Sequence, residues 1–131
     1  MVNRKAKGTR GENELVKFFN ENNWSSIRVA GSGSTRWPSP DVLAANAVRR
    51  LAIECKVTKD KKKYFPNQEI EQLQTFSQKF GSEAWIAVKF PDEPWYFLMP
   101  EDLKDTGACW AVDVELAKLR GLTKEELLGR D

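Results

Sequence analysis

The sequence predicts one α/β domain in which helices flank a central mixed β-sheet. Segments 9–22 and 67–80 space their apolar residues three and four apart, as amphipathic helices do. A chain of 131 residues is long enough for one core, so residues 1–131 are expected to form a single domain. Short apolar runs of strand length lie at 26–30, 40–45, 51–56, 84–90, 95–98 and 108–112.

The first helix is expected to begin near Thr9, because Thr9-Arg10-Gly11-Glu12 matches a capping box. Residues 1–7 before it are expected to form a mobile basic arm. Glu12 precedes Leu15 by three positions and Phe19 by seven, which places its carboxylate on the buried face of the helix. A carboxylate there needs a cation or a metal as partner. The alternative is that Glu12 only completes the capping box.

Two apolar runs, 40–45 and 51–56, flank a polar break and predict a β-hairpin whose turn type stays open. Asp41 stands at the entry of the first strand. On the second strand Glu54 and Lys56 are two apart and share a face, while Leu51, Ile53 and Cys55 take the core-directed face. Two carboxylates and an amine can therefore converge at one end of the hairpin.

Helix-capping residues and residues that end helices or form turns predict the remaining elements. Asn67 is a candidate cap for the second helix, and Gly81 ends it. The turn 91–94 joins two strands, and one helical turn is expected at 100–103. A second capping box, Thr123-Lys124-Glu125-Glu126, predicts a short C-terminal helix.

Composition excludes several classes of protein. The chain has no histidine, which excludes Ser-His triads and His-ligated zinc. Its two cysteines are too few for a disulfide scaffold or a four-cysteine zinc site, so a metal must be held by oxygen. No apolar run reaches the length of a membrane span, and no secretory signal is visible, so we expect a cytoplasmic protein without a membrane partner.

The net charge of +2 is unevenly distributed. Residues 1–10 carry four basic and no acidic side chains, and residues 56–63 carry five basic and one acidic. Residues 92–105 carry five acidic and one basic. This segregation favours one phosphate-binding face. The alternative for Lys61 to Lys63 is a solvated loop.

The Asp41, Glu54 and Lys56 set suits a divalent-metal phosphodiesterase. Carboxylate oxygens bind a hard cation, and an ammonium can serve the attacking water or the phosphate. The Gly- and Ser-rich loop 31–40 leads directly to Asp41 and is a candidate substrate contact. In this loop Trp37 either stacks on an unpaired base or folds onto the surface. In the second helix Gln68 either orients water or phosphate, or is simply solvated. The alternative for the whole set is an ordinary hairpin with surface charges.

Pro40-Asp41 followed by Glu54-Cys55-Lys56 resembles the signature of the PD-(D/E)xK nucleases. With further segments, the chain resembles the archaeal Holliday junction resolvases over most of its length. The matching segments are 7–15 (Lys-Gly-Thr-Arg-Gly-Glu-Asn-Glu-Leu), 27–34 (Ile-Arg-Val-Ala-Gly-Ser-Gly-Ser), Pro40-Asp41, 53–56 (Ile-Glu-Cys-Lys), 76–81 and 87–89. About thirty C-terminal residues match no recognisable pattern.

The resemblance implies the restriction-endonuclease-like nuclease fold and Mg²⁺-dependent paired nicking of a four-way DNA junction by a homodimer, with Mn²⁺ able to substitute and no organic cofactor. It implies metal ligation by Asp41 and Glu54, with Glu12 bound to or beside the metal and the Cys55 carbonyl completing the shell. Lys56 would position the attacking water, and Ser32 would lie close to the scissile phosphate. From the charge pattern, the loop and the resemblance, the candidate DNA contacts are Arg4, Lys5, Lys7, Arg10, Arg28, Ser32, Arg36, Trp37, Lys59, Lys61 and Lys62.

Other readings stay open. The domain could cut another DNA target, or bind a junction or a duplex without cutting it. A two-fold dimer suits a four-way junction because the junction itself has approximate two-fold symmetry. The aromatic residues of the C-terminal half could supply the dimer patch or belong to the core: they are Trp85, Trp95, Phe97 and Trp110.

Overall fold

The structure, a computed structural model, describes residues 4–31 and 36–129, with side chains from Gly8 onward. Five strands form the main sheet in the order β1-β2-β3-β5-β6. β3 and β5 run parallel and the other neighbouring pairs antiparallel, so the sheet is mixed, as predicted. The strands are β1 (Ser25–Arg28), β2 (Val42–Ala45), β3 (Arg50–Val57), β5 (Glu83–Lys89) and β6 (Trp95–Leu98).

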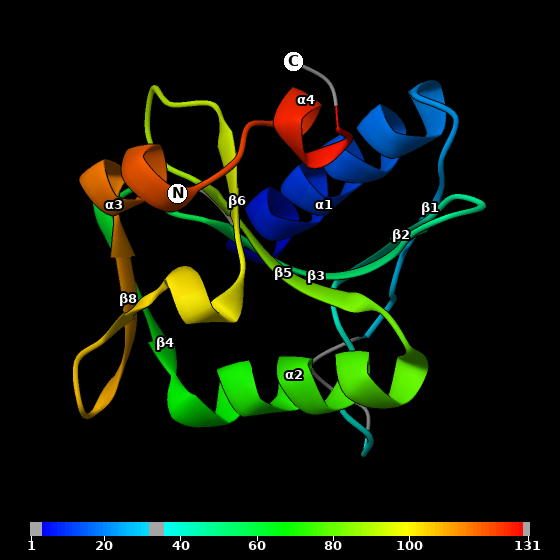
Figure 1. The fold of residues 1–131 in the computed structure, drawn as a ribbon. Helices are drawn as coiled ribbons and strands as arrows, with labels where there is room; N and C mark the ends of the chain where they lie inside the picture. The colour runs from blue at the N-terminus through cyan, green and yellow to red at the C-terminus, as the bar shows by residue number, and fades with distance from the viewer. Residues whose placement is uncertain (1–3, 32–35, 130–131) are drawn as a thin grey trace.

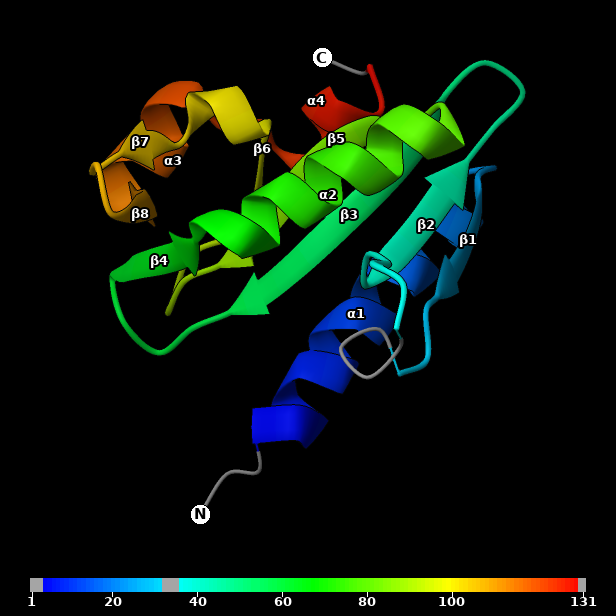
Figure 2. The ribbon, with the colours of Figure 1, turned by 90° about the horizontal axis from the view of Figure 1, so that it is seen from below.

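Helices cover both faces of this sheet (Figure 1, Figure 2). α1 (Arg4–Glu21) and α4 (Lys124–Leu127) lie on one face, and α2 (Asn67–Phe80) lies on the other. Because side chains of β3 alternate between the faces, Ile53 packs in the core under α1 while Ala52 packs in the core under α2. The buried positions of Leu51, Ile53 and Cys55 match the predicted core-directed face.

α1 begins at Arg4, five residues before the predicted start. Residues 4–7, expected to belong to a mobile arm, are therefore its first turn, and Thr9 lies inside the helix. Arginine, lysine and alanine are good helix formers, and a run of them extends the helix past the capping-box signal. Glu12 consequently has no capping role at the start of α1.

The β2–β3 hairpin is confirmed, with Val42 opposite Ile53 and Ala45 opposite Arg50. The side-chain oxygen of Asn46 accepts the backbone N–H groups of Val48 and Arg49 at 2.8 and 2.7 Å. This Asx-type arrangement holds the turn that the sequence left open.

Several other predicted elements are also confirmed. α2 ends at Gly81, whose φ of 77° is in the left-handed region, although its first helical residue is Asn67 and its N-cap is Pro66. The second capping box forms as expected, with the Thr123 N–H donating to Glu126 and the Glu126 N–H donating to Thr123. The helical turn η1 (Pro100–Asp102) lies where one was predicted.

A second, three-stranded sheet differs from the prediction. Its order is β4-β8-β7, formed by β4 (Lys62–Pro66), β8 (Cys109–Asp113) and β7 (Lys104–Asp105). The sequence predicts only the strand of β8, because the lysine run before Tyr64 is typical of a solvated loop. Phe65 is the one fully buried residue of β4, and Trp110 lies opposite it in register.

α3 (Val114–Arg120) was not predicted either. Its N-cap is Asp113, whose carboxylate accepts the Leu116 N–H at 2.8 Å. Of the aromatic residues proposed for a dimer patch, Trp85, Trp95 and Phe97 are buried core residues. Trp110 is partly buried and packs against the core under α2. The core alternative is therefore right for the first three.

In the part of the chain that the structure describes, no helix is long and apolar enough to cross a membrane.

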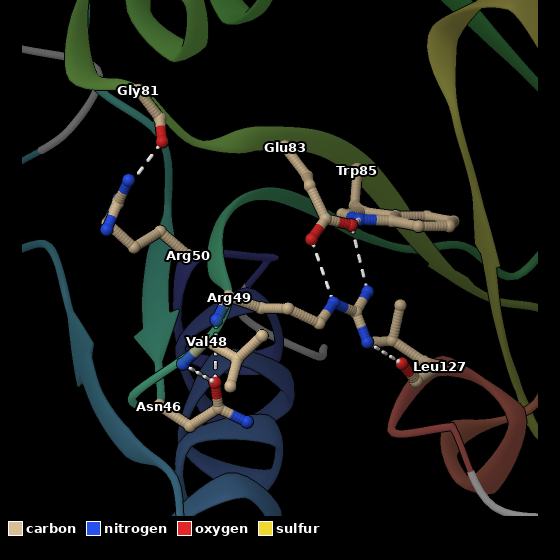
Figure 3. Close-up of polar contacts among 8 residues, drawn as sticks. All are labelled: Asn46, Val48, Arg49, Arg50, Gly81, Glu83, Trp85 and Leu127. Carbon is tan, nitrogen blue, oxygen red and sulfur yellow. Dashed lines mark hydrogen bonds and ion pairs between the residues drawn. The ribbon is translucent and has the colours of Figure 1, made fainter.

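Arg49 joins three elements at the end of the sheet where β3 begins (Figure 3). Its guanidinium donates to both carboxylate oxygens of Glu83 at 2.8 Å and to the Leu127 carbonyl at 2.5 Å. It also lies 5.5 Å from the centre of the Trp24 ring. The Trp85 indole donates to the same Glu83 carboxylate at 3.0 Å. These bonds hold α4 and the hairpin turn onto β5.

The Arg49–Glu83 pair predicts a pH-dependent contribution to stability. The hydrogen bonds from Arg49 hold the pKa of Glu83 below its usual range, although partial burial opposes this. The stabilisation is therefore present above the unfolded-state pKa and is lost as the pH falls through the lower folded-state pKa. Glu83→Gln should lower the free energy of unfolding at pH 7 by about 1 kcal/mol, because the pair is bidentate but partly exposed.

Urea unfolding of the wild type and of Glu83→Gln between pH 7 and pH 3.5 measures this difference. It should shrink as the medium is acidified and should be absent in an Arg49→Met background at every pH. A difference in unfolding free energy that stays constant between pH 7 and pH 3.5 would show that the charge of Glu83 does not contribute to stability.

Candidate active site

Asp41 is fixed immediately before β2 begins. Its backbone N–H donates to the Ile53 carbonyl at 3.0 Å, and its carbonyl accepts the Val29 N–H at 2.8 Å. Its carboxylate oxygen Oδ2 accepts the Cys55 N–H at 2.9 Å. The side chain thus accepts a β3 N–H that lies beyond the first residue of β2, and the carboxylate cannot turn away without leaving a strand N–H unpaired.

Glu54, next to Cys55 on β3, brings a second carboxyl group to Asp41. Burial, a hydrogen bond with Asp41 and the Asp41 charge raise the pKa of Glu54 far above its usual range. Lys56 opposes this rise, and Glu69 adds to it. Two buried carboxyl groups this close cannot both ionise easily unless a cation lies beside them.

Glu12 reaches the same place from α1. Its side chain is only 16% exposed, and its Oε1 lies 3.8 Å from the Arg28 guanidinium on β1. Burial and the Asp41 charge raise the pKa of Glu12, while Arg28 and Lys56 act in the opposite direction. The buried-face placement from the helical spacing is thus correct, and the cation beside Glu12 is Arg28.

The close approach of α1 to the sheet depends on Gly11. A Cβ at this position would lie 2.7 Å from Val57 Cγ2 and 3.3 Å from the Trp95 ring. Such a contact is too short, so the absent side chain lets α1 pack directly over β3 and β6. The neighbouring Glu12 is thereby brought to the level of Asp41.

Lys56 extends from β3 toward α2. Its ammonium lies 2.6 Å from Glu69 Oε1, and the two side chains are 29% and 24% exposed. Burial alone would lower the pKa of Lys56, but the hydrogen bond and charge of Glu69, with Glu54 and Asp41, raise it above its ordinary value. The ammonium is therefore held charged between α2 and the two carboxyl groups.

Glu69 is the site residue that sequence reasoning missed. The second helix was predicted to bring Gln68 to this edge, but Gln68 is exposed and Glu69 faces Lys56. Adjacent helical positions differ by about 100° in direction, so the correct residue follows only once the packing of α2 on β3 is known.

Several of the candidate DNA contacts lie within the described residues. Arg10 and Lys59 line a surface pocket of about 510 Å³ beside Gly11, together with Lys89. Trp37 is 71% exposed, so it is not folded onto the surface, and the Arg36 guanidinium lies 5.2 Å from its ring centre.

Of the remaining candidates, only some have side chains within the described residues. Lys61 and Lys62 are exposed, and the Lys62 ammonium lies 5.1 Å from the centre of the Tyr64 ring. Arg4, Lys5 and Lys7 are in the first turn of α1, with side chains outside the described residues, as is Ser32 as a whole.

The donor set fits a hard cation with few protein ligands. Among the described residues, no three Asp, Glu, Cys or His side chains converge closely enough to enclose a metal ion. The adjacent carboxyl groups of Asp41 and Glu54 nevertheless offer oxygen ligands, and a cation between them would favour their ionised forms. A cation that keeps most of its own waters, as Mg²⁺ does, needs no more than such a pair.

Comparisons with known proteins agree on one family. The family model described as "Archaeal holliday junction resolvase (hjc)" matches residues 3–130. Crossover junction endodeoxyribonuclease Hjc of Archaeoglobus fulgidus is 39% identical over 126 residues, covering 96% of this chain and 92% of the relative. The Hjc protein of Methanocaldococcus jannaschii is 32% identical over 124 residues, covering 95% and 88%.

A solved structure supports the same grouping. The structure of Archaeoglobus fulgidus Hjc, a Holliday junction resolvase from an archaeal hyperthermophile, matches with a TM-score of 0.86. The sequences are 38% identical, and the match covers 92% of this chain and 97% of that chain. The predicted nuclease fold is thereby confirmed.

Two glycines of α1 give a matched test of the close approach. Gly11→Ala should lower the free energy of unfolding, because overpacking against Val57 and Trp95 costs about 1–3 kcal/mol. The higher helix propensity of alanine offsets about 1 kcal/mol of this loss. Gly8→Ala should raise it by roughly 0.5–1 kcal/mol, because no atom lies within 4 Å of a Cβ there. Thermal unfolding measures both changes. Equal stabilisation by the two substitutions would contradict this packing.

Proposed function

Because this chain belongs to the archaeal Holliday junction resolvase family, we propose that it resolves four-way DNA junctions as an endonuclease. The observation that carries this function is the pairing of Asp41 with Glu54 beside Lys56, within the fold of the family. Such an activity belongs to DNA recombination and repair. We place it in the cytoplasm with the DNA, where the unpaired thiols of Cys55 and Cys109 stay reduced.

The metal is proposed to be Mg²⁺, with Mn²⁺ able to replace it. Asp41 and Glu54 would hold it, the Cys55 carbonyl would add a backbone oxygen, and Glu12 would bind it or lie beside it. When bound, the cation would make an attacking water more acidic and stabilise the charge that develops on the phosphate. The support is the oxygen donor set of Asp41 and Glu54, two adjacent carboxyl groups whose joint ionisation a cation would favour.

The chain's own groups orient the reaction. The Cys55 N–H fixes one oxygen of Asp41, so the carboxylate needs no rearrangement during the reaction. The Lys56 ammonium, held charged beside both carboxyl groups, is placed to donate to the attacking water or to a phosphate oxygen. Ser32 and Gln68 remain proposals for contacts to the scissile phosphate and to water.

DNA is proposed to approach along the basic side chains around this centre. Arg10 and Lys59 line the pocket beside Gly11, and Arg28 forms the ion pair with Glu12. These three are the contacts proposed beside the catalytic groups. Trp37 offers an exposed aromatic face, four residues before Asp41, for a base left unstacked at the branch point. The outlying contacts are Arg4, Lys5, Lys7, Arg36, Lys61 and Lys62.

Cleavage assays test the function and its ligands together. The wild type should nick a four-way junction in Mg²⁺ or Mn²⁺, should be inactive in chelator, and should leave plain duplex uncut. Asp41→Asn and Glu54→Gln should each slow cleavage by roughly 1,000-fold, because the cation contributes several kcal/mol to the transition state.

Glu71→Gln, an exposed acid on α2, is the control and should cleave like the wild type. Wild-type rates in both site variants would refute the assignment. Preferential cutting of duplex would indicate another DNA target, and tight junction binding without product in either metal would indicate a binding protein.

Paired nicking of opposed strands requires two active sites, and we propose a two-fold homodimer that supplies them. Three of the four aromatic residues first considered for its interface are core residues and the fourth, Trp110, is partly buried, so the interface is proposed to involve other aromatic residues. Phe76 and Phe80 stack on α2 with ring centres 5.1 Å apart, and Phe80 is 50% exposed. Two adjacent aromatic rings at one exposed position suit an interface between copies better than the isolated exposed apolar residues do.

Light scattering at micromolar concentration should give twice the 15.0 kDa chain mass for the wild type. Phe80→Asp should give the monomer mass, because a charge would be buried in the interface. Leu119→Asp, at an exposed apolar residue of α3, should leave the dimer intact. A monomeric wild type, or dissociation caused by Leu119→Asp alone, would argue against this interface.

A further inference from the structure

The ion pair between Lys56 and Glu69 connects the catalytic strand to α2. Lys56 is the last polar residue of the proposed catalytic set on β3, and Glu69 lies in the first turn of α2. Their charged atoms are 2.6 Å apart, and both side chains are largely withdrawn from solvent. A charge-assisted contact of this length in a partly buried place restricts the rotamers of a long side chain.

The position of Glu69 has an electrostatic cost. The site already contains the carboxyl groups of Glu12, Asp41 and Glu54, and the Glu69 charge further raises the pKa of Glu54. A fourth acid beside this group destabilises it unless the acid does something there that a neutral residue would not. Among the described residues, the ion pair with Lys56 offsets this cost.

We propose that Glu69 is a positioning residue that holds the Lys56 ammonium for catalysis. An ammonium has three N–H donors, so the ion pair with Glu69 leaves donors for the attacking water and a phosphate oxygen beside Asp41 and Glu54. Without Glu69, the four-carbon side chain would sample several rotamers and spend little time in the productive one. This inference rests on the role of Lys56 in the proposed function.

A simpler role for Glu69 is stabilisation of α2. An acid in the first turn interacts favourably with the helix N-terminus, and Pro66 at the N-cap provides no side-chain hydrogen bond. The two roles make different predictions. Helix stabilisation would affect thermal unfolding and would be independent of Lys56, whereas positioning would affect the chemical step only when Lys56 is present.

The test is a double-mutant cycle on single-turnover junction cleavage in Mg²⁺ with enzyme in excess. Glu69→Gln should slow cleavage by about 10- to 100-fold, the scale of a misplaced catalytic group, and Glu69→Ala should slow it further. The dissociation constant for the junction without metal should stay unchanged in both. Lys56→Met should be strongly impaired, and adding Glu69→Gln to it should cause no further loss.

Glu71→Gln on the same helix serves as the matched control and should match the wild type in rate and in melting temperature. The inference is overturned if Glu69→Gln cleaves at the wild-type rate or faster, or if it slows Lys56→Met as much as it slows the wild type. Full activity of Lys56→Met would remove both the role of Lys56 and that of Glu69. An impaired Lys56→Met beside a fully active Glu69→Gln would remove the role of Glu69 alone.

Discussion

The hydrogen bond from the Cys55 N–H to the Asp41 carboxylate ties the fold to the site. The register of β2 with β3 ends where Val42 lies opposite Ile53. Beyond it, the Asp41 side chain, in place of a backbone carbonyl, accepts the N–H of Cys55 on β3. Turning the carboxylate away would leave a strand N–H unpaired, at a cost of about 1–3 kcal/mol. Because Glu54 precedes Cys55 on the same strand, fixing Asp41 there also brings the two carboxyl groups together. The site is thus a consequence of how the hairpin ends.

This arrangement concentrates negative charge at one end of the sheet. Glu12 and Glu54 both have raised pKa values, with burial as the main cause. Asp41 is the next cause, through its charge at Glu12 and through a hydrogen bond and then its charge at Glu54. Arg28 and Lys56 offset only part of this charge. At the other end, Arg49 donates to Glu83 and to the Leu127 carbonyl and holds the hairpin turn, β5 and α4 together. The sheet therefore has one end that these bonds stabilise and another end whose closely placed carboxyl groups are suited to bind a cation.

The local parts of this design could be predicted from the sequence, and the non-local parts could not. The period of two along a strand fixes the shared face of Glu54 and Lys56, and helical spacing places Glu12 on the buried face of α1. The start of α1 was misplaced because the capping-box signal at Thr9 competes with a run of good helix formers. β4 was missed because its lysines resemble a solvated loop and only Phe65 turns inward. Glu69 was missed by one position, since the direction of a helical residue depends on packing that no short pattern contains.

The central claim is that the Asp41 and Glu54 carboxylates hold the divalent cation. Anomalous scattering from crystals of the wild type soaked in Mn²⁺ tests it most directly, because Mn²⁺ favours the same oxygen ligands as Mg²⁺ and is visible. We expect an anomalous peak between these two carboxylates, which disappears in crystals of Asp41→Asn. Mn²⁺ bound elsewhere on the protein, with this position empty, would contradict the claim.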